Sequence, residues 1–206
     1  MSSKEMFDLP SVAVILATYN GERYVEEQLM SLQSQIGVDI TVFVSDDCST
    51  DSTISIISNF SLSDFCSISI VILDKETKFG SATSNFLSAI IKSPLQSFDY
   101  VCFCDQDDIW LPKKLMRAVA LICDNDVAGY SSNYISWHHS SGRCDLIKKD
   151  YPQTPFDYMF QTPGPGCSMV IRAREALLLV NFLKNMTDRE RSKIWYHDWF
   201  TYAFLH

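Results

Sequence analysis

The chain lacks the glycine-rich phosphate loops that many nucleotide-binding proteins carry. It has seven glycines among 206 residues, and neither GxxxxGK(S/T) nor a GxGxxG after the first apolar run occurs. The chain therefore lacks the usual sequence fingerprints of ATPases and of dinucleotide-binding enzymes. A nucleotide bound by this chain must instead be held by acidic side chains, aromatic side chains and a metal ion.

Positive charge is also scarce. The chain has 17 lysines and arginines against 25 aspartates and glutamates, a formal net charge of −8. Because nucleic-acid binding depends on neutralising phosphates, this balance argues against a nucleic-acid partner. It does not exclude a phosphate-bearing ligand whose charge a metal ion bridges to the protein.

Paired cysteine motifs and long apolar runs are missing as well. None of the seven cysteines lies in a CxxC or zinc-type Cys/His spacing, and Cys102, Cys104 and Cys167 fall in apolar runs typical of a reduced core. No apolar run approaches the roughly 20 residues that span a bilayer. Residues 1–10 form a polar leader without the apolar centre of a signal peptide. We expect a cytoplasmic protein, for which peripheral contact with the inner face of the membrane stays open.

What the sequence does contain is an alternation of short apolar runs and amphipathic segments. The runs predict strands at residues 11–17, 40–44, 68–73 and 100–104, and the segments predict helices at 22–35, 54–60, 81–91 and 112–123. A strand followed by a helix, repeated in this way, predicts an α/β fold with a mostly parallel central sheet flanked by helices.

The second half has a different character. We predict a strand at 127–137, an irregular substrate-facing loop at 138–160, a strand at 167–171, a helix at 174–183 and a last helix near the end of the chain. No linker divides the sequence, so residues 11–206 are expected to form a single domain.

Acidic residues follow two of the predicted strands. Asp46 and Asp47 end the second strand, and Asp105, Asp107 and Asp108 end the fourth. Either group alone could be helix capping. However, ligands of open α/β sheets bind at the carboxyl ends of the strands, and like charges held there repel unless a cation lies among them. Hard oxygen ligands of this kind suit magnesium or manganese.

A nucleoside diphosphate fits such an edge. Asp47 could accept a hydrogen bond from a base imide, Tyr19 could stack on the base, and Asp105 could bind ribose hydroxyls. Two rival classes stay open here. A phospho-receiver signalling domain also binds magnesium through strand-end aspartates, but its strand-end lysine cannot be placed. A nucleotidyltransferase normally carries an early glycine-rich basic loop, which this chain lacks.

Five motifs in order resemble the family 2 glycosyltransferases, and their variants look most like the bacterial rhamnosyltransferase branch. They are ATYNG at 17–21, SDDCSTD at 45–51, CDQDDIWLP at 104–112, GCSMV at 166–170 and HDW at 197–199. The resemblance implies the GT-A fold, a Rossmann-like domain that binds a nucleotide sugar. It implies an enzyme that moves a sugar, rhamnose in that branch, with inversion from a UDP- or dTDP-linked donor. The acceptor would be a hydroxyl of a saccharide or lipid-linked saccharide in surface polysaccharide synthesis, and the cofactor manganese or magnesium.

The resemblance also assigns residues to roles. Asp198 would be the catalytic base, with capping of the last helix as the alternative, and Asp107 and Asp105 would bind the metal. Asp108 is expected to turn the chain into the next helix. The nucleotide would contact Thr18, Tyr19, Asn20, Asp46, Asp47 and Asp105, and the substrate would lie near Trp110, Gly166, His197 and Trp199.

Several of these residues carry a second interpretation. His197 could assist Asp198, but a local hydrogen bond is the favoured interpretation, and Trp110 is either a wall of the site or core packing. Gly166 is expected to let the backbone approach the donor sugar or acceptor. Family members usually continue beyond the position of His206, so we expect this chain to lack their C-terminal extension. Acceptor choice is expected to lie in residues 138–160.

Overall fold

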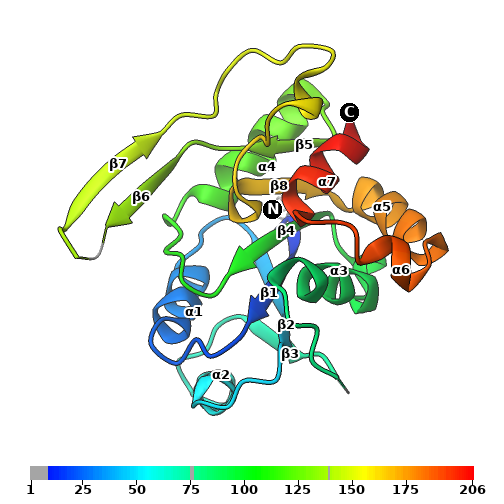
Figure 1. Cartoon of the computed structure of the whole chain (residues 1–206). Coiled ribbons are helices and arrows are strands. Elements are labelled where there is room, and N and C mark those ends of the chain that lie inside the picture. The colour runs from blue at the N-terminus through cyan, green and yellow to red at the C-terminus, as the bar shows by residue number, and fades with distance from the viewer. Residues whose placement is uncertain (1–8, 75–76, 139) are drawn as a thin grey trace, which may run out of the picture.

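A computed structural model describes residues 9–74, 77–138 and 140–206 (Figure 1). Most of the expected leader at 1–10, and residues 75–76 of the loop after the third strand, lie outside the described residues. Within the described part of the chain, no helix is both long enough and apolar enough to cross a membrane.

The core of the molecule is a six-stranded sheet in the order β3-β2-β1-β4-β8-β5. Its parallel part confirms the first four predicted strands. These are β1 (Ser11–Thr18), β2 (Asp39–Asp46), β3 (Ser69–Ile72) and β4 (Tyr100–Asp105). Antiparallel pairing then adds β8 (Met169–Arg172) beside β4 and β5 (Gly129–Ser131) at the edge. The sheet is therefore mostly parallel, as predicted.

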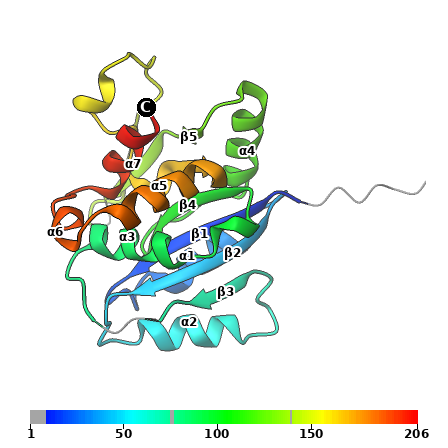
Figure 2. The ribbon, with the colours of Figure 1, turned by 90° about the vertical axis from the view of Figure 1, so that its right-hand side faces the viewer.

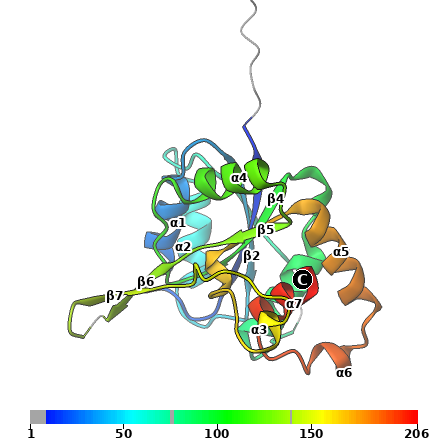
Figure 3. The same cartoon turned by 90° about the horizontal axis from the view of Figure 1, so that it is seen from above.

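Helices cover both faces of this sheet (Figures 2 and 3). They are α1 (Val25–Gln33), α2 (Thr53–Ser61), α3 (Ala82–Lys92), α4 (Lys114–Asn125), α5 (Ala173–Asn185), α6 (Asp188–Arg191) and α7 (His197–Leu205). Short 3-10 turns lie at Leu95–Ser97, Asp157–Met159 and Gly166–Ser168. The helices α1, α2 and α4 pack on one face, and α3, α5 and α7 on the other.

Strand β1 shows why the first apolar run is continuous rather than alternating. Val12, Val14 and Leu16 enter the core beneath α1 and α4, whereas Ala13 and Ile15 enter the core beneath α3 and α5. Successive side chains of a strand point to opposite faces, so a strand covered on both sides must be apolar at every position. Because β1 pairs with both β2 and β4, its register aligns the carboxyl ends of these two strands.

The second half corrects two expectations. The strand predicted at 127–137 is broken at residues 132–133, after which β6 (Tyr134–His138) leaves the sheet and pairs with β7 (Arg143–Ile147). Residues 143–147, expected to be irregular, therefore form half of a hairpin that projects from the domain (Figure 3). Gly142 has a φ of +66°, a left-handed backbone that suits a tight turn.

The base of the hairpin is closed by one side chain. The Oδ1 atom of Asn133 accepts hydrogen bonds from the backbone N–H groups of Lys149, at 2.5 Å, and Asp150, at 3.1 Å. These bonds bring the chain back to the sheet after β7. The loop that follows, up to the turn at Gly166–Ser168, lies beside α7.

Candidate active site

The register of the parallel strands brings the predicted site residues to one edge. Thr18 is paired with Asp46 across β1 and β2, and Ala17 is paired with Asp105 across β1 and β4. Strand ends that share a level present their following loops to the same side of the sheet. The acidic groups of the second and fourth strands therefore open on one edge, as predicted.

The loops after β1 and β2 are hydrogen-bonded to each other. Thr18 donates from Oγ1 to Asp46 at 2.8 Å, and Asp46 also accepts from the backbone N–H of Ser49 at 2.7 Å. Asn20 has a φ of +48°, and its Oδ1 accepts from the backbone N–H of Thr50 at 2.9 Å. Thr18, Asn20 and Asp46 thus build the rim on which a nucleotide would rest, and their contact with a nucleotide stays a prediction.

Asp47 anchors a third loop. Its buried carboxylate accepts hydrogen bonds from the backbone N–H groups of Phe79, at 2.6 Å, and Gly80, at 2.8 Å. Each carboxylate oxygen has a second lone pair, so a further bond to a base imide is compatible with these two. Nearby, the buried Asn85 of α3 donates to the carbonyl of Ser45 at 2.7 Å and holds the end of β2.

Tyr19 offers a half-exposed ring at the same edge. The ammonium of Lys78 donates to the Tyr19 hydroxyl at 2.7 Å and lies 3.9 Å from the centre of the ring. The hydrogen bond raises the pKa of Lys78. The pair places an aromatic face and a positive charge where a nucleotide is expected, and it brings together two loops that are far apart in the sequence.

Gln106 is a residue of the site to which the sequence assigned no role. Its Oε1 accepts from the backbone N–H of Tyr19 at 2.9 Å, and its Nε2 donates to the carbonyl of Tyr19 at 3.1 Å. A Cβ on Gly21 would lie 2.2 Å from the same Oε1, so Gly21 leaves the space that Gln106 occupies. In the sequence Gln106 stands out only as a glutamine between two aspartates. Spacing alone could not show that its side chain contacts Tyr19.

The acidic cluster comprises Asp105, Asp108 and Cys167, whose ligand atoms all lie within 4.8 Å of one another. Burial, reinforced by the charges of Asp108, Asp107 and Asp198, raises the pKa of Asp105 to about 7. The thiol of Cys167 donates to Asp108, and the Oδ2 atom of Asp108 is buried without a hydrogen-bond partner among the described residues. Crowded carboxylates of this kind are stabilised by a cation.

This geometry changes the division of roles within the cluster. Asp108 does not turn the chain into α4, because that helix begins at Lys114 with Lys113 at its N-cap. Its carboxylate faces inward instead, beside Asp105 and Cys167. Asp107 is exposed and lies outside the group of three, so its metal role stays a prediction.

The donor set of this cluster fits a hard divalent cation in part. Two carboxylates at one edge match the usual protein contribution to a magnesium or manganese site, in which phosphates and water supply the other ligands. The third member is different, because thiols prefer softer metals. Burial also raises the pKa of the Cys167 thiol. The carboxylates of Asp105 and Asp108 are therefore the groups best suited to hold such an ion.

Asp198 lies on the last helix, directly after His197, whose ring contacts Phe103 of β4. The charge of Asp198 is among those that raise the pKa of Asp105. Asp198 lies in the first turn of α7, where Tyr196 is the N-cap, and it accepts from the backbone N–H of Trp199 at 2.7 Å. It is therefore not the helix cap. Burial raises the pKa of Asp198 and makes it a stronger base.

His197 packs in the core rather than in the open site. Its ring stacks on Phe86 at 4.1 Å between ring centres, and burial lowers its pKa to about 4. Nε2 is buried and has no hydrogen-bond partner among the described residues, so the favoured local hydrogen bond is not made through this atom. A Cβ on Gly166 would lie 2.3 Å from that atom, so the space left by this glycine is taken by His197. Approach of a sugar to Gly166 stays a prediction.

The two tryptophans differ in their surroundings. Trp110 is buried in the core with the ammonium of Lys114 3.8 Å from its ring centre, which is the packing alternative left open by the sequence. Trp199 is half-buried, and its Nε1 donates to the carbonyl of Tyr158 at 2.5 Å. This hydrogen bond connects α7 to the loop at 138–160, which is expected to determine acceptor specificity.

Acidic groups at the carboxyl ends of two parallel strands, β2 and β4, together with a carboxylate from a later helix, form the arrangement that the sequence predicted for a domain of the GT-A type. The comparison with protein families agrees. The family model described as glycosyl transferase family 2 matches residues 13–177, and the chain belongs to this family. The predicted family and fold are thereby confirmed.

Among curated proteins, the chain is 44% identical over 189 residues to the dTDP-rhamnosyl transferase RfbG of Shigella flexneri. The match covers 92% of this chain and 64% of the relative, so the chain spans less than two thirds of that protein. It is also 25% identical to the Escherichia coli glucosyltransferase WfgD, covering 81% of this chain and 61% of that protein.

Solved structures show the same fold. Residues 1–349 of S. aureus TarS superpose with a TM-score of 0.63 at 22% identity, covering 88% of this chain and 53% of that one. The mannosyltransferase PcManGT of Pyrobaculum calidifontis, solved with GDP-Man and Mn²⁺, superposes with a TM-score of 0.52 at 16% identity. That match covers 84% of this chain and 52% of that one.

Proposed function

We propose that the protein transfers rhamnose from a dTDP-linked donor to a hydroxyl of a saccharide acceptor, with inversion at the sugar carbon. The observation that carries this proposal is that the first turn of α7, which holds Asp198, packs on β4: the ring centre of His197 is 5.0 Å from that of Phe103, two residues before Asp105. The similarity to a dTDP-rhamnosyl transferase supports the choice of donor. A receiver-type signalling domain, the rival class, has no support from the family to which the chain belongs.

In this proposal the nucleotide lies over the ends of β1, β2 and β4. Tyr19 and Asp47 bind the base, and Asp105 meets the ribose, with Thr18, Asn20 and Asp46 holding the rim. Asp105 and Asp108, with Asp107 on the exposed side, would hold manganese or magnesium. Such an ion supplies Lewis-acid stabilisation of a diphosphate leaving group.

Asp198 acts on the acceptor. Its carboxylate takes the proton of an acceptor hydroxyl while that oxygen forms a bond to the anomeric carbon, and the bond from that carbon to the diphosphate oxygen breaks. General-base catalysis of this kind contributes roughly 10²–10⁴-fold to a rate. A single displacement inverts the configuration of the sugar carbon.

The support for the acceptor class comes from a relative: the name of WfgD of Escherichia coli gives a sugar linked to diphosphoundecaprenol as its acceptor. We propose a saccharide or lipid-linked saccharide of a bacterial surface polysaccharide, reached from the cytoplasmic side by peripheral contact with the inner face of the membrane. Trp199, with Tyr196 close to it, would present aromatic surface to the incoming sugar.

A thermal-shift panel tests the ligand class. Saturating dTDP or UDP with Mn²⁺ should raise the melting temperature by roughly 5 °C or more, since a ligand at 100 times its Kd adds about 2.7 kcal/mol to folding stability. Acetyl phosphate, the probe for a receiver domain, should have no effect. Release of dTDP from dTDP-rhamnose then tests turnover. Stabilisation by acetyl phosphate alone would contradict the proposal.

A further inference from the structure

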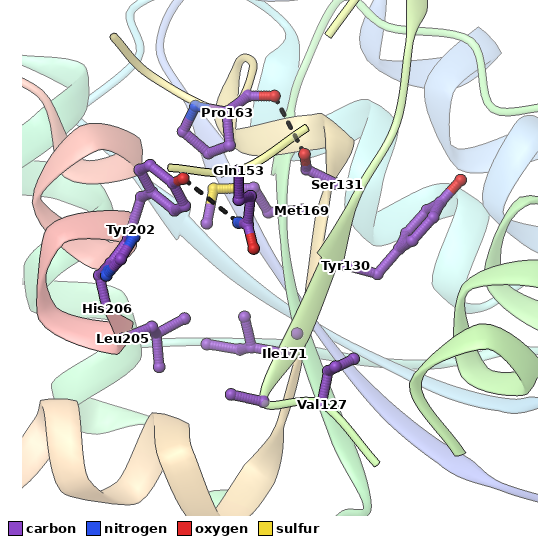
Figure 4. Close-up of a pocket in the computed structure, with 12 residues that line it drawn as sticks. Val127, Tyr130, Ser131, Gln153, Pro163, Met169, Ile171, Tyr202, Leu205 and His206 are labelled. Atoms are coloured by element: carbon purple, nitrogen blue, oxygen red, sulfur yellow. Dashed lines mark hydrogen bonds between the residues drawn. The ribbon is translucent and has the colours of Figure 1, made fainter. Parts of the chain in front are cut away.

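A cavity of about 320 Å³ lies beside the edge strand β5, between that strand and helix α7 (Figure 4). A second hollow of about 250 Å³ adjoins it and shares Ser131, Gln153, Pro163 and Tyr202 with the first. Neither includes the acidic strand ends described above. The larger volume is at the lower end of the roughly 300–1,000 Å³ typical of small-molecule sites.

The cavity has one polar wall and one apolar wall. On the polar side, Gln153 donates to the Tyr202 hydroxyl at 3.2 Å, and that hydroxyl donates to Asp157 at 2.8 Å. Ser131 donates to the carbonyl of Pro163 at 3.0 Å. The apolar side is formed by Val127, Met169, Ile171 and Leu205.

Two residues that line the cavity, Tyr202 and Met169, are close in the sequence to residues in or near the acidic cluster. Tyr202 is four residues after Asp198 on α7, so the two side chains project from the same face about one helical turn, or ~6 Å, apart. Met169 follows the turn that contains Cys167, and the thiol of Cys167 is hydrogen-bonded to Asp108. Lys149 lines the adjoining hollow, and its charge acts on Asp198.

The chemistry of the walls selects the ligand class. Aspartate, amide and hydroxyl groups alternate with aliphatic surface, which suits a ring that carries hydroxyls on its rim and C–H groups on its faces. The lining of the cavity includes no lysine or arginine, and in the adjoining hollow Lys149 is accompanied by Asp150 and Asp157, so the walls offer no excess of positive charge for a diphosphate. The volume is too small for a folded partner or a polymer chain. An uncharged mono- or disaccharide fits these limits.

We propose that this cavity is a subsite for a sugar ring of the acceptor, with Gln153 and Tyr202 as its hydrogen-bonding residues. The inference rests on the proposed function, because it assigns the acceptor to a place next to Asp198. It also explains why α7 carries both the proposed base and a cavity wall. An acceptor seated against Tyr202 would extend a neighbouring hydroxyl along α7 towards Asp198.

Saturation-transfer NMR with free L-rhamnose, N-acetyl-D-glucosamine and D-glucose tests the subsite without turnover. At least one sugar should show saturation transfer, and Gln153→Ala and Tyr202→Phe should each weaken its affinity about fivefold, the effect of one lost hydrogen bond. Gln96→Ala is the matched control, since Gln96 is exposed, lies in the 3-10 turn before β4 and lines neither hollow.

The same samples separate this inference from the function it rests on. Nucleotide affinity, measured by titrating dTDP with Mn²⁺, reports on the donor site and should be unchanged in both cavity variants. Sugar binding that both variants leave intact, or saturation transfer from none of the three sugars, would overturn the subsite. Loss of dTDP binding in the unsubstituted chain would instead contradict the proposed function.

Discussion

Asp198 shows how burial prepares a single side chain for a role. An ordinary aspartate is a weak base at neutral pH, but Asp198 is half-buried and its pKa is raised. Proton transfer is more efficient when the pKa of the base approaches the working pH. Its neighbour His197 is the reverse case, a neutral ring whose pKa burial lowers to about 4, which removes it as a source of charge.

Replacing Asp198 with asparagine should abolish transfer and spare donor binding. We expect kcat to fall roughly 10²–10⁴-fold, because the amide cannot accept the acceptor proton. Dissociation constants for dTDP with Mn²⁺ should be unchanged. Asp124→Asn, an exposed position on α4, is the control. Turnover at the original rate in Asp198→Asn would remove Asp198 from the base role.

The raised pKa of Asp105 predicts an unusual dependence of folding stability on pH. Its pKa is about 7 in the folded chain against an ordinary value of 3.8, so the folded state binds more protons between these values. Its contribution to the free energy of unfolding therefore falls as pH rises from about 4 to 7. Mn²⁺ should reduce this loss, because a cation compensates the ionised carboxylates.

Urea unfolding at pH 5 and pH 8, with and without Mn²⁺, measures this effect. The pKa of His197 is lowered from 6.5, so its contribution has the opposite sign and is lost as pH falls. The comparison with Asp105→Asn isolates the carboxyl: the variant should lose less stability between pH 5 and 8 than the unsubstituted chain. Equal losses in the two proteins would contradict the assignment.

Most residues of the candidate site lie on the loops that follow the strands, and side-chain hydrogen bonds connect these loops to one another. Gln106, in the loop after β4, makes paired hydrogen bonds to the backbone of Tyr19 in the loop after β1. Asp47 in the loop after β2 holds the backbone before α3. The nucleotide site proposed here therefore depends on contacts between loops as much as on the strands.

A double-mutant cycle tests the contact between two of these loops. Gly21→Ala should lower dTDP affinity about fivefold or more, because the new Cβ would displace Gln106. Gln106→Ala should cause a similar loss. In the Gln106→Ala background the alanine at position 21 should cost little, since the clash is gone. Additive losses in the double variant would show that the two residues act separately.

The elements that could be predicted were those whose pattern is local. The four parallel strands and their helices follow from apolar runs and helical spacing, and each was recognised to within a few residues. The hairpin β6–β7 was not recognised, because Ile135, Trp137 and Leu146 remain exposed on it and leave no contrast between a buried face and a solvent face. Its formation depends on pairing between strands.

Across the whole molecule, the distribution of residues between the two cores determines which segments meet. The face of the sheet under α3, α5 and α7 brings the C-terminal residues over Phe86 and Phe103 of the first half. Packing of His197 there sets the position of α7. The approach of Asp198 to Asp105, and the cavity beside β5, both follow from that contact.

The first four strands and their helices, the acidic strand ends and the family could be predicted from the sequence alone, because hydrophobic period and motifs are patterns within short stretches of the chain. Three contacts are visible only in the folded chain: Asp108 faces Cys167, Gly166 makes room for His197, and Gln106 is hydrogen-bonded to Tyr19. Such contacts join segments far apart in the chain. They depend on how two elements pack in three dimensions, which local spacing does not specify.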